Sequence, residues 1–249
     1  MEWHDEEGIR WLEATLPGAR AAFSTRLGGV SDEPYDTLNL GILTGDDRED
    51  VLENRGRLAA ALGLDRESVV IARQVHGAEV MVHEGPQEPS PFVDPQPGIP
   101  ELDGHVVRDP HLAPLVFVAD CLPVALAGPQ GLALLHCGWR GLAGGIVERG
   151  GDAVGARAAA IGPGIGPCCY EVGEEVLAEF RDLGPGIAVG RMLDLPEVAR
   201  RLLARAGVKQ VEASGLCTSC NPDLFYSHRR DNGRTGRQAG VAWLEPGKG

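Results

Sequence analysis

The chain has 249 residues, of which 43% are hydrophobic, and a net charge of -13 at pH 7. This length and composition predict a globular protein with a substantial core. An electrostatic interface with nucleic acid or anionic lipid needs a basic surface, which so acidic a chain does not provide. We therefore expect a small-molecule partner rather than nucleic acid or a membrane.

The composition also bears on the cellular compartment. No segment approaches the roughly 20 apolar residues of a membrane span, and the start MEWHDEEGIRW lacks the basic and apolar parts of a signal peptide. We expect a cytoplasmic protein. Six cysteines are too few for a disulfide scaffold at this length, so in a reducing compartment they are thiols or metal ligands.

The first element with a clear signal is a helix over residues 46–63. Asp46 or Asp47 is suited to cap it, and Gly63 ends it. One helical face carries the apolar residues Val51, Leu52, Leu58, Ala59 and Leu62.

Residues 68–83 predict two strands around a polar connection, Arg73 to Gly77. His76 then lies on the connection or at a strand end, where ligands are common. Six prolines lie between Pro86 and Pro100, a composition that continues neither helix nor sheet. This segment is predicted to be a long surface loop, either a lid or a simple excursion.

Strands and helices interleave over the second half of the chain. Residues 162–173, GPGIGPCCYEVG, lack the lysine and the spacing of a phosphate-binding loop and are interpreted as a structural turn. Without a repeat or a linker, the pattern predicts one mixed α/β domain spanning 1–249. The predicted strands cover 113–121, 123–127, 131–137, 156–162, 208–214 and 238–244, and the predicted helices cover 141–154, 171–184 and 194–207.

The stretch ADCLPVALAGPQGLALLHCGWRG, residues 119–141, contains three metal-binding residue types, Cys121, His136 and Cys137. Successive strand side chains point to opposite faces, so His136 and Cys137 cannot both face Cys121. A two-residue turn at Gly128 and Pro129 places Cys121 opposite His136, whereas a turn longer by one residue places it opposite Cys137. The count leaves both registers open.

A cysteine thiolate and neutral histidines are good zinc ligands, and three protein ligands with an open fourth position characterise a catalytic site. His76 is the best third ligand because it lies at an element boundary among polar neighbours. The alternative is that Cys121 is a small buried residue and that His76 and His136 merely bond to backbone groups. Less distinctive settings surround His4, His83, His105, His111 and His228.

The sequence CTSC, with Cys217 and Cys220, has the spacing of half a zinc knuckle. Cys168 and Cys169 are conceivable partners, but a lone CxxC is weak evidence. The sequence alone therefore predicts neither a second zinc nor a thioredoxin-like redox site, which would need the pair to open a helix after a strand.

Arginine is the remaining chemical resource. Planar guanidinium groups bind phosphate through paired hydrogen bonds, so local arginines suit a phosphate even in an acidic protein. Arg26 is expected at a strand end, and Arg140 follows His136 by four residues. For Arg234 and Arg237 we favour positions in a solvated loop, where their side chains pair with surface carboxylates. The cluster SHRRDNGRTGR contains Arg229, Arg230, Arg234 and Arg237.

Several motifs in one order resemble the YfiH family, also called the laccase-domain or polyphenol oxidase family, whose members include purine nucleoside phosphorylases. They are STRLGGVS, RQVHG, ADCLP, HCGWRG, GPGIGPCCYEVG, CT and YSHRRDNGRTGR, covering residues 20–243. The resemblance implies a single-domain layered α/β sandwich with one zinc held by His76, Cys121 and His136. Cu²⁺ suits the same ligands. The family usually has Ala at Cys137, which we interpret as core, and Tyr at His228, whose role stays open.

The resemblance also implies reactions. Family members cleave adenosine, inosine, guanosine or methylthioadenosine with phosphate, giving the base and ribose 1-phosphate, and they deaminate adenosine to inosine. For deamination, zinc would lower the pKa of a bound water toward ~7. Asp120 is then either a proton shuttle or an orienting residue.

For phosphorolysis we expect the phosphate to be held by Arg26 and Arg230, with Arg140 as a further contact. Gln74 and Asn39 complete the expected substrate-binding residues. The preferred nucleoside, the main reaction, the native metal and the oligomeric state are not readable from the chain.

Three other functions compete with this interpretation. A four-copper polyphenol oxidase needs repeated His-x-His ligation, and the seven histidines include no such pair. Editing of a peptidoglycan precursor is an enzymatic alternative linked to the family. A binding module with a structural zinc is the non-enzymatic one, and a fourth protein ligand would support it.

Overall fold

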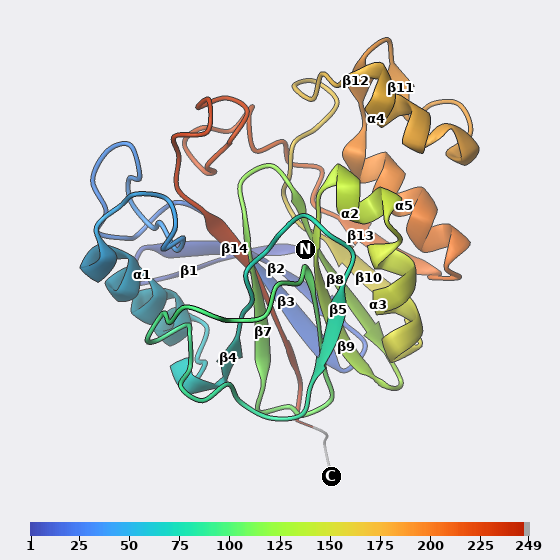
Figure 1. The fold of residues 1–249 in the computed structure, drawn as a ribbon. Coiled ribbons are helices and arrows are strands. Elements are labelled where there is room, and N and C mark those ends of the chain that lie inside the picture. Colours follow the sequence, from blue (N-terminus) through green and yellow to red (C-terminus); the bar gives the residue numbers. More distant parts are fainter. Residues whose placement is uncertain (247–249) are drawn as a thin grey trace.

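Two six-stranded mixed sheets form the centre of the computed structural model, which describes residues 1–246 (Figure 1). The first sheet has the order β1 (Glu2–Glu6), β2 (Ile9–Leu16), β3 (Ala19–Ser24), β14 (Gln238–Leu244), β7 (Ala113–Val118) and β4 (Val69–Val70). The second has the order β13 (Gln210–Ala213), β10 (Ala158–Ile161), β8 (Leu122–Gly128), β9 (Gly131–Cys137), β6 (Gly104–Val107) and β5 (Val80–His83). Ala188–Val189 (β11) and Met192–Leu193 (β12) form a small ribbon.

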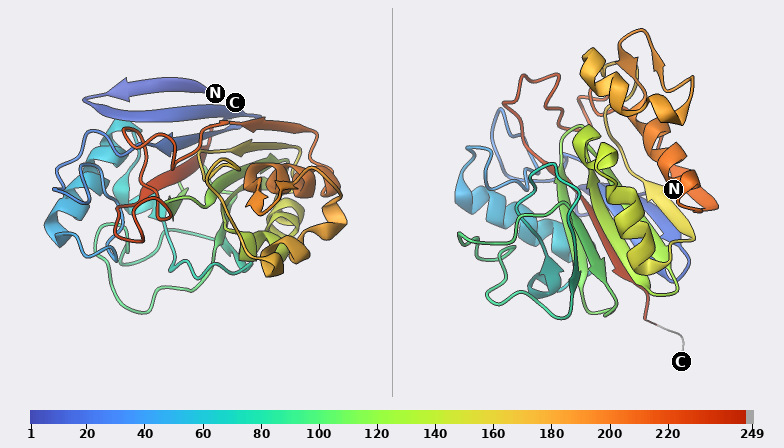
Figure 2. Two further views of the ribbon diagram at one scale, coloured as in Figure 1. Left: turned by 90° about the horizontal axis from the view of Figure 1, so that it is seen from above. Right: turned by 45° about the vertical axis from the view of Figure 1, so that its right-hand side comes forward.

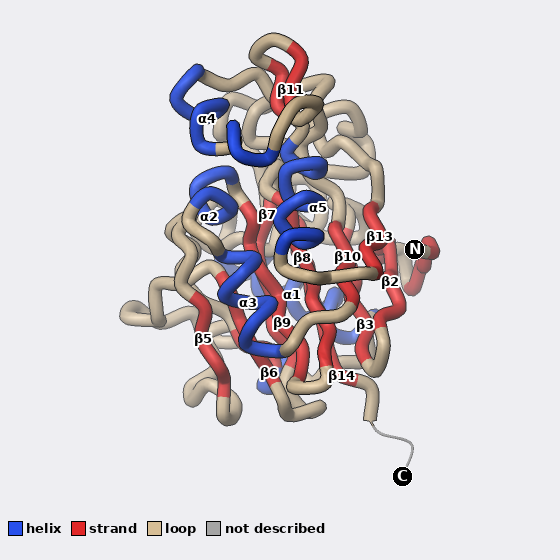
Figure 3. The backbone as a smooth tube through the Cα atoms, turned by 90° about the vertical axis from the view of Figure 1, so that its right-hand side faces the viewer, coloured by secondary structure: helices blue, strands red, loops and turns tan. Residues whose placement is uncertain are grey.

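The sheets pack face to face and helices cover their outer faces, which gives four layers (Figure 2). Between the sheets, Phe23 and Val116 meet Ala125 and Leu134. Helices α2 (Trp139–Ala143), α3 (Ile146–Val154) and α5 (Leu195–Arg205) cover the second sheet (Figure 3), and α1 (Arg48–Ala61) covers the first. The expected layered α/β sandwich is confirmed.

Helix α1 begins where the sequence predicts, because Asp47 accepts hydrogen bonds from the backbone of Glu49 and Asp50. Its buried face also carries a charged residue, Arg55, only 2% exposed. Arg55 donates to the carbonyls of Leu40 and Phe92, and burial lowers its pKa to about 10. It therefore fastens the proline-rich segment 86–100 to α1.

Two predicted helices differ from the structure. The helix expected over 141–154 is two helices, because Gly145 has a left-handed φ of 85° between α2 and α3. The helix expected over 171–184 is shorter, consisting of α4 (Glu174–Glu179) and a 3₁₀ turn at Arg181–Leu183.

The sequence analysis does not predict β1 and β2, and it implies β3 only as the strand that ends near Arg26. β2 packs against both the inter-sheet core and α1, so Trp11 and Leu12 are both buried on opposite faces. Alternation of apolar and polar residues is therefore lost.

The β8–β9 hairpin has neither of the two registers considered. Gly128 pairs with Gly131 around a turn at Pro129 and Gln130, so Pro123 faces His136 and Leu122 faces Cys137. Cys121 precedes β8. His136 therefore pairs with Pro123, two residues beyond Cys121. Because side chains alternate along a strand, this shift of two residues leaves His136 on the face expected for Cys121.

No helix within residues 1–246 combines the length and apolar character needed to cross a bilayer.

Candidate active site

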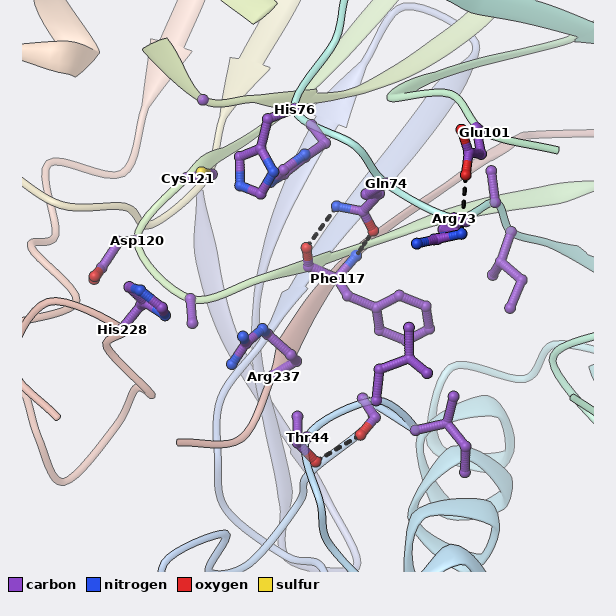
Figure 4. A pocket seen from close by; sticks show the side chains of 18 of the residues that line it. Thr44, Arg73, Gln74, His76, Glu101, Phe117, Asp120, Cys121, His228 and Arg237 are labelled. Carbon is purple, nitrogen blue, oxygen red and sulfur yellow. Dashed lines mark hydrogen bonds and ion pairs between the residues drawn. The ribbon is translucent and has the colours of Figure 1, made fainter. Parts of the chain in front are cut away.

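Three side chains from distant segments converge at one end of the second sheet. His76 lies on the loop between β4 and β5, Cys121 lies just before β8, and His136 lies on β9. Their ligand atoms are all within 4.8 Å of one another. The rings of His76 and His136 meet edge to face with centroids 4.9 Å apart, and Figure 4 shows His76 beside Cys121.

Unusual backbone geometry builds this cluster. His76 has a φ of 60° and Asp120, next to Cys121, has a φ of 95°, a region that non-glycine residues seldom adopt. A Cβ atom on Gly138 would lie 3.1 Å from Cys121 Sγ and 3.3 Å from the His76 ring. The glycine of HCGWRG is therefore needed for space, and the strained residues mark a functional site.

A buried carboxylate, Asp103, supports two of the three residues. It accepts a hydrogen bond from His136 Nδ1 at 2.7 Å. It also accepts the backbone N–H groups of Val75, His76 and Gly77 at 3.1, 3.0 and 2.7 Å. Because Nδ1 of His136 is bound, Nε2 is left for a metal.

Sequence reasoning missed Asp103. A single carboxylate ahead of an unpredicted strand, β6, gives no spacing signal.

The charges of the cluster favour metal ligation. Burial alone would raise the pKa of the Cys121 thiol, but the imidazoles of His136 and His76 outweigh burial and lower it. Burial likewise would lower the pKa of His136, and the Cys121 sulfur and Asp103 carboxylate raise it instead. Cys121 therefore loses its proton readily, and the thiolate is the form that binds metals.

The cluster opens into a cavity of about 1130 Å³, ample for a nucleoside-sized ligand. Phe117 and Trp139 contribute aromatic surface, and the proline-rich segment contributes Pro91 and residues 95–99. This segment therefore borders the site.

Asp120 lines the cavity beside the cluster and is 8% exposed. Its Oδ1 accepts the hydroxyl of Thr218 at 2.6 Å, and its Oδ2 accepts the backbone N–H of Arg229 at 2.7 Å. Each oxygen keeps a second lone pair. The carboxylate is thus held in a fixed orientation next to Cys121.

Arg26 and Arg230 are not among the residues that line this cavity. Arg26 donates to the carbonyls of Asp36 and Pro222 and to the Asp36 carboxylate. Arg230 forms a bidentate ion pair with Asp231, and it also donates to two backbone carbonyls. Both guanidinium groups are thus engaged by the protein itself, and the expectation that these two arginines hold phosphate stays a prediction.

Five other arginines line the cavity: Arg55 and Arg73, which are engaged by backbone carbonyls and by Glu101, and Arg140, Arg229 and Arg237. Arg140 is exposed and stacks on the Trp139 ring at 4.6 Å. Arg237 is half-buried and donates to the carbonyls of Thr235 and Gly236 (Figure 4). The expected surface-carboxylate pairing of Arg237 is therefore wrong. Its loop folds inward because the backbone N–H of Arg237 donates to Asn39 Oδ1.

The two remaining substrate-binding candidates differ in position. Gln74 lines the cavity, but its amide exchanges two 2.8 Å hydrogen bonds with the backbone of Phe117 (Figure 4). Asn39 is fully buried away from the cavity lining and bonds to Thr44, Asp46 and two backbone N–H groups. Asn39 therefore holds a loop next to the cavity through Gly41, Thr44 and Arg237, and its contact with substrate stays a prediction.

The two departures from the family pattern are also placed. Cys137 is fully buried among Leu122, Leu135 and Val147 on the helix side of β9, away from Cys121. His228 is exposed and lines the cavity near Asp120 (Figure 4).

The family model described as "Multi-copper polyphenol oxidoreductase laccase" matches residues 20–245. The chain belongs to this family. The resemblance seen in the motifs is confirmed, and similar curated proteins carry YfiH-type names. The purine nucleoside phosphorylase YlmD of Geobacillus stearothermophilus is 37% identical over 93% of each chain. A purine nucleoside phosphorylase of Deinococcus radiodurans is 41% identical over 95% of this chain and 94% of its own.

Solved structures of family members share the fold over almost the whole chain. A YfiH protein of Bacillus licheniformis has a TM-score of 0.88 at 32% identity, covering 98% of this chain and 99% of its own. YlmD of G. stearothermophilus has a TM-score of 0.87 at 34% identity with the same coverage.

Proposed function

We propose that this family member is a zinc-dependent purine nucleoside enzyme. It would cleave adenosine, inosine or guanosine with phosphate to give the base and ribose 1-phosphate, and methylthioadenosine to give adenine and methylthioribose 1-phosphate. It would also deaminate adenosine to inosine. The observation that carries the proposal is the His76, Cys121 and His136 cluster, which faces a cavity large enough for a nucleoside and lined by Asp120. The names of the purine nucleoside phosphorylases that resemble the chain support the substrate class.

The three residues fit a metal. Two imidazoles and one thiolate form a zinc donor set, and Gly138 leaves room beside Cys121 and His76. When bound, zinc supplies Lewis-acid chemistry. Cu²⁺ suits the same donors, so metal availability would decide which ion is held.

We propose that phosphate binds through Arg140, Arg229 and Arg237. Arg237 is the most buried of the three, and burial lowers the pKa of its guanidinium, an effect that the nearby charges of Cys121 and Asp120 only partly offset. Arg140 is exposed and free to turn toward a ligand. Guanidinium groups would neutralise the dianion and aim one of its oxygens at the anomeric carbon.

Asp120 is the proposed proton carrier. Departure of the purine requires a proton on the base, and deamination requires one on the leaving amine. Asp120 precedes Cys121 and lines the same cavity, and the bonds from Thr218 and Arg229 fix the orientation of its carboxylate. The ring of Phe117 offers an apolar surface for the purine.

Specific observations weigh against the other functions. Within residues 1–246, no fourth histidine, cysteine or carboxylate joins the His76 cluster, which favours an open catalytic position over a closed structural zinc. A four-copper centre would need further histidines, yet the nearby pair His83 and His105 is buried and bonded to itself. Editing of a peptidoglycan precursor remains an alternative substrate class.

Product analysis tests the proposal. Purified protein of known metal content is incubated with adenosine, with and without phosphate. Phosphate-dependent adenine and ribose 1-phosphate indicate phosphorolysis, and inosine without phosphate indicates deamination. The same incubations are run with inosine, guanosine and methylthioadenosine. If no free base forms from any of the four nucleosides and no inosine forms from adenosine, the proposal is overturned. Oxidation of phenols by copper-loaded protein would favour the oxidase.

A further inference from the structure

A second group of potential metal ligands lies outside the His76 cluster. It consists of Cys168, Cys169, Cys217 and Cys220, whose sulfur atoms are all within 4.8 Å of one another. Cys220 Sγ is 3.3 Å from Cys168 Sγ and 3.4 Å from Cys169 Sγ. All four are free thiols. The sequence spacing alone does not predict this meeting, because about fifty residues separate the two pairs.

The backbone brings adjacent cysteines to one side. Gly166 begins a tight turn whose carbonyl accepts the N–H groups of Cys169 and Tyr170 at 3.0 and 3.1 Å. In a strand, Cys168 and Cys169 would point to opposite faces, but the turn removes that alternation. The second segment runs alongside, since Cys217 bridges to Gly164 and the N–H of Thr218 donates to the Gly164 carbonyl at 3.0 Å.

The surroundings of Cys217 suit a thiolate. The backbone N–H of Gly166 donates to Cys217 Sγ at 3.2 Å, and such a bond stabilises negative charge on sulfur. A Cβ atom on Gly166 would lie 3.5 Å from Cys168 Sγ and 3.6 Å from Cys217 Sγ. The two cysteine segments therefore pack against each other at Gly166, in ordinary van der Waals contact.

We propose that these four cysteines bind one Zn²⁺ ion as a structural tetrathiolate site. A Zn–S bond of about 2.3 Å places tetrahedral sulfurs about 3.8 Å apart, and the observed separations, 3.3 Å to at most 4.8 Å, bracket that value. Binding releases the thiol protons to solvent and changes no oxidation state. Four protein ligands leave no position for substrate, which distinguishes this site from the His76 cluster.

The site would secure the frame of Asp120. Ile165, in the first cysteine segment, donates its N–H to the Asp120 carbonyl at 2.8 Å. Thr218, between the second pair of cysteines, donates its hydroxyl to the Asp120 carboxylate at 2.6 Å. A zinc ion joining the two segments would therefore hold the backbone and the side chain of Asp120 from both sides.

Metal content of four proteins tests the proposal: wild type, C121S, C168S/C220S and the triple variant, each purified with zinc present and gel-filtered. Zinc is measured by mass spectrometry against protein concentration. Wild type should hold two zinc ions per chain. C121S should hold one, at the four cysteines, and C168S/C220S should hold one, at the His76 cluster. The triple variant should hold none. A zinc content unaffected by C168S/C220S would overturn the proposal, whatever happens at the His76 cluster.

Cobalt titration of C121S keeps the test independent of whether C168S/C220S folds. One equivalent of Co²⁺ should give intense thiolate charge-transfer absorption and the visible bands of a tetrahedral ion, and zinc should displace both. Alkylation of the unfolded protein gives the opposing outcome. If two or four of these cysteines resist alkylation until a reductant is added, they form disulfides and the zinc assignment is wrong.

Discussion

The buried carboxylate of Asp103 accepts a 2.7 Å hydrogen bond from Nδ1 of His136. The same carboxylate accepts the backbone N–H groups on both sides of His76 and that of His76 itself. One side chain thus sets the ring orientation of one metal-ligand candidate and the loop conformation of another. Burial alone would raise the pKa of Asp103, but the hydrogen bonds from His136 and from the backbone N–H groups outweigh burial and lower it.

Replacement of Asp103 by asparagine should weaken zinc binding by about 10- to 100-fold, the usual effect of losing a carboxylate behind a ligating histidine. Asparagine keeps the shape but removes the charge, and its NH₂ group cannot accept the N–H bonds of the loop. Competition with a chromophoric chelator measures the affinity. Glu101→Gln serves as a control, because Glu101 is an exposed carboxylate near the cavity that pairs with Arg73. Equal affinities for D103N and wild type would show that Asp103 does not support the metal.

The sequence predicted parts of the fold for identifiable reasons. Strands β7 to β9 are short apolar runs between turn residues, and α5 has a cap at Asp194 and a stop at Gly207. Helix α1 likewise has its cap. Strand β2 gives no alternating pattern of apolar and polar residues, because both of its faces are covered. The predicted register of the β8–β9 hairpin is wrong because the turn lies at Pro129 and Gln130.

The site was predictable only where motifs are distinctive. His76, Cys121 and His136 could be named from the family motifs, and the structure brings them together. The roles of arginines could not be read in the same way. Arg26 follows β3 and Arg237 precedes β14, so both lie near a strand end. Arg26 is nevertheless paired with Asp36, whereas Arg237 faces the cavity. That difference depends on loop contacts distant in sequence.

Cys121→Ala should abolish zinc binding at the His76 cluster and both proposed reactions, because the thiolate is one of only three candidate ligands. Cys137→Ala is the matched control. Cys137 is one residue from His136 but fully buried in the helix-side core, so its truncation should cost about 1 kcal/mol of unfolding free energy. Its metal content should be unchanged. Metal analysis, product assays and denaturant unfolding distinguish the two. If C121A kept the zinc stoichiometry of wild type together with its activity, the His76 site would be refuted.

Arg140→Ala should raise the KM for phosphate about 10-fold or more, the loss of one hydrogen-bonded charge contact. Its exposed position should leave the unfolding free energy unchanged. Arg26→Ala should leave the KM for phosphate unchanged and lower the unfolding free energy. Removing its three hydrogen bonds and its contact with the Tyr226 ring should cost about 1–3 kcal/mol of stability. Phosphate kinetics and thermal unfolding provide the two readouts, and a phosphate KM altered only in R26A would return Arg26 to the phosphate site.

The pair His83 and His105 should make the fold sensitive to acid. His83 Nε2 and His105 Nδ1 are 2.9 Å apart and buried. Burial lowers the pKa of both, that of His105 to about 3, with the charge of His83 adding to the effect and Asp103 opposing it. The folded state therefore keeps both rings neutral where the unfolded state, with a pKa near 6.5, takes up protons. Their stabilising contribution is complete above pH 6.5 and is lost as pH falls below it.

Denaturant unfolding of wild type and His83→Leu/His105→Leu between pH 7.5 and 4.5 measures this contribution. Each proton bound only by the unfolded state reduces the unfolding free energy by about 1.4 kcal/mol per pH unit. Wild type should therefore lose stability more steeply than the double variant below pH 6.5, and the two slopes should agree above pH 7. Metal release at the His76 cluster affects both proteins alike and cancels in the difference. Parallel curves throughout would mean that the buried histidines are protonated in the folded state as readily as in the unfolded one.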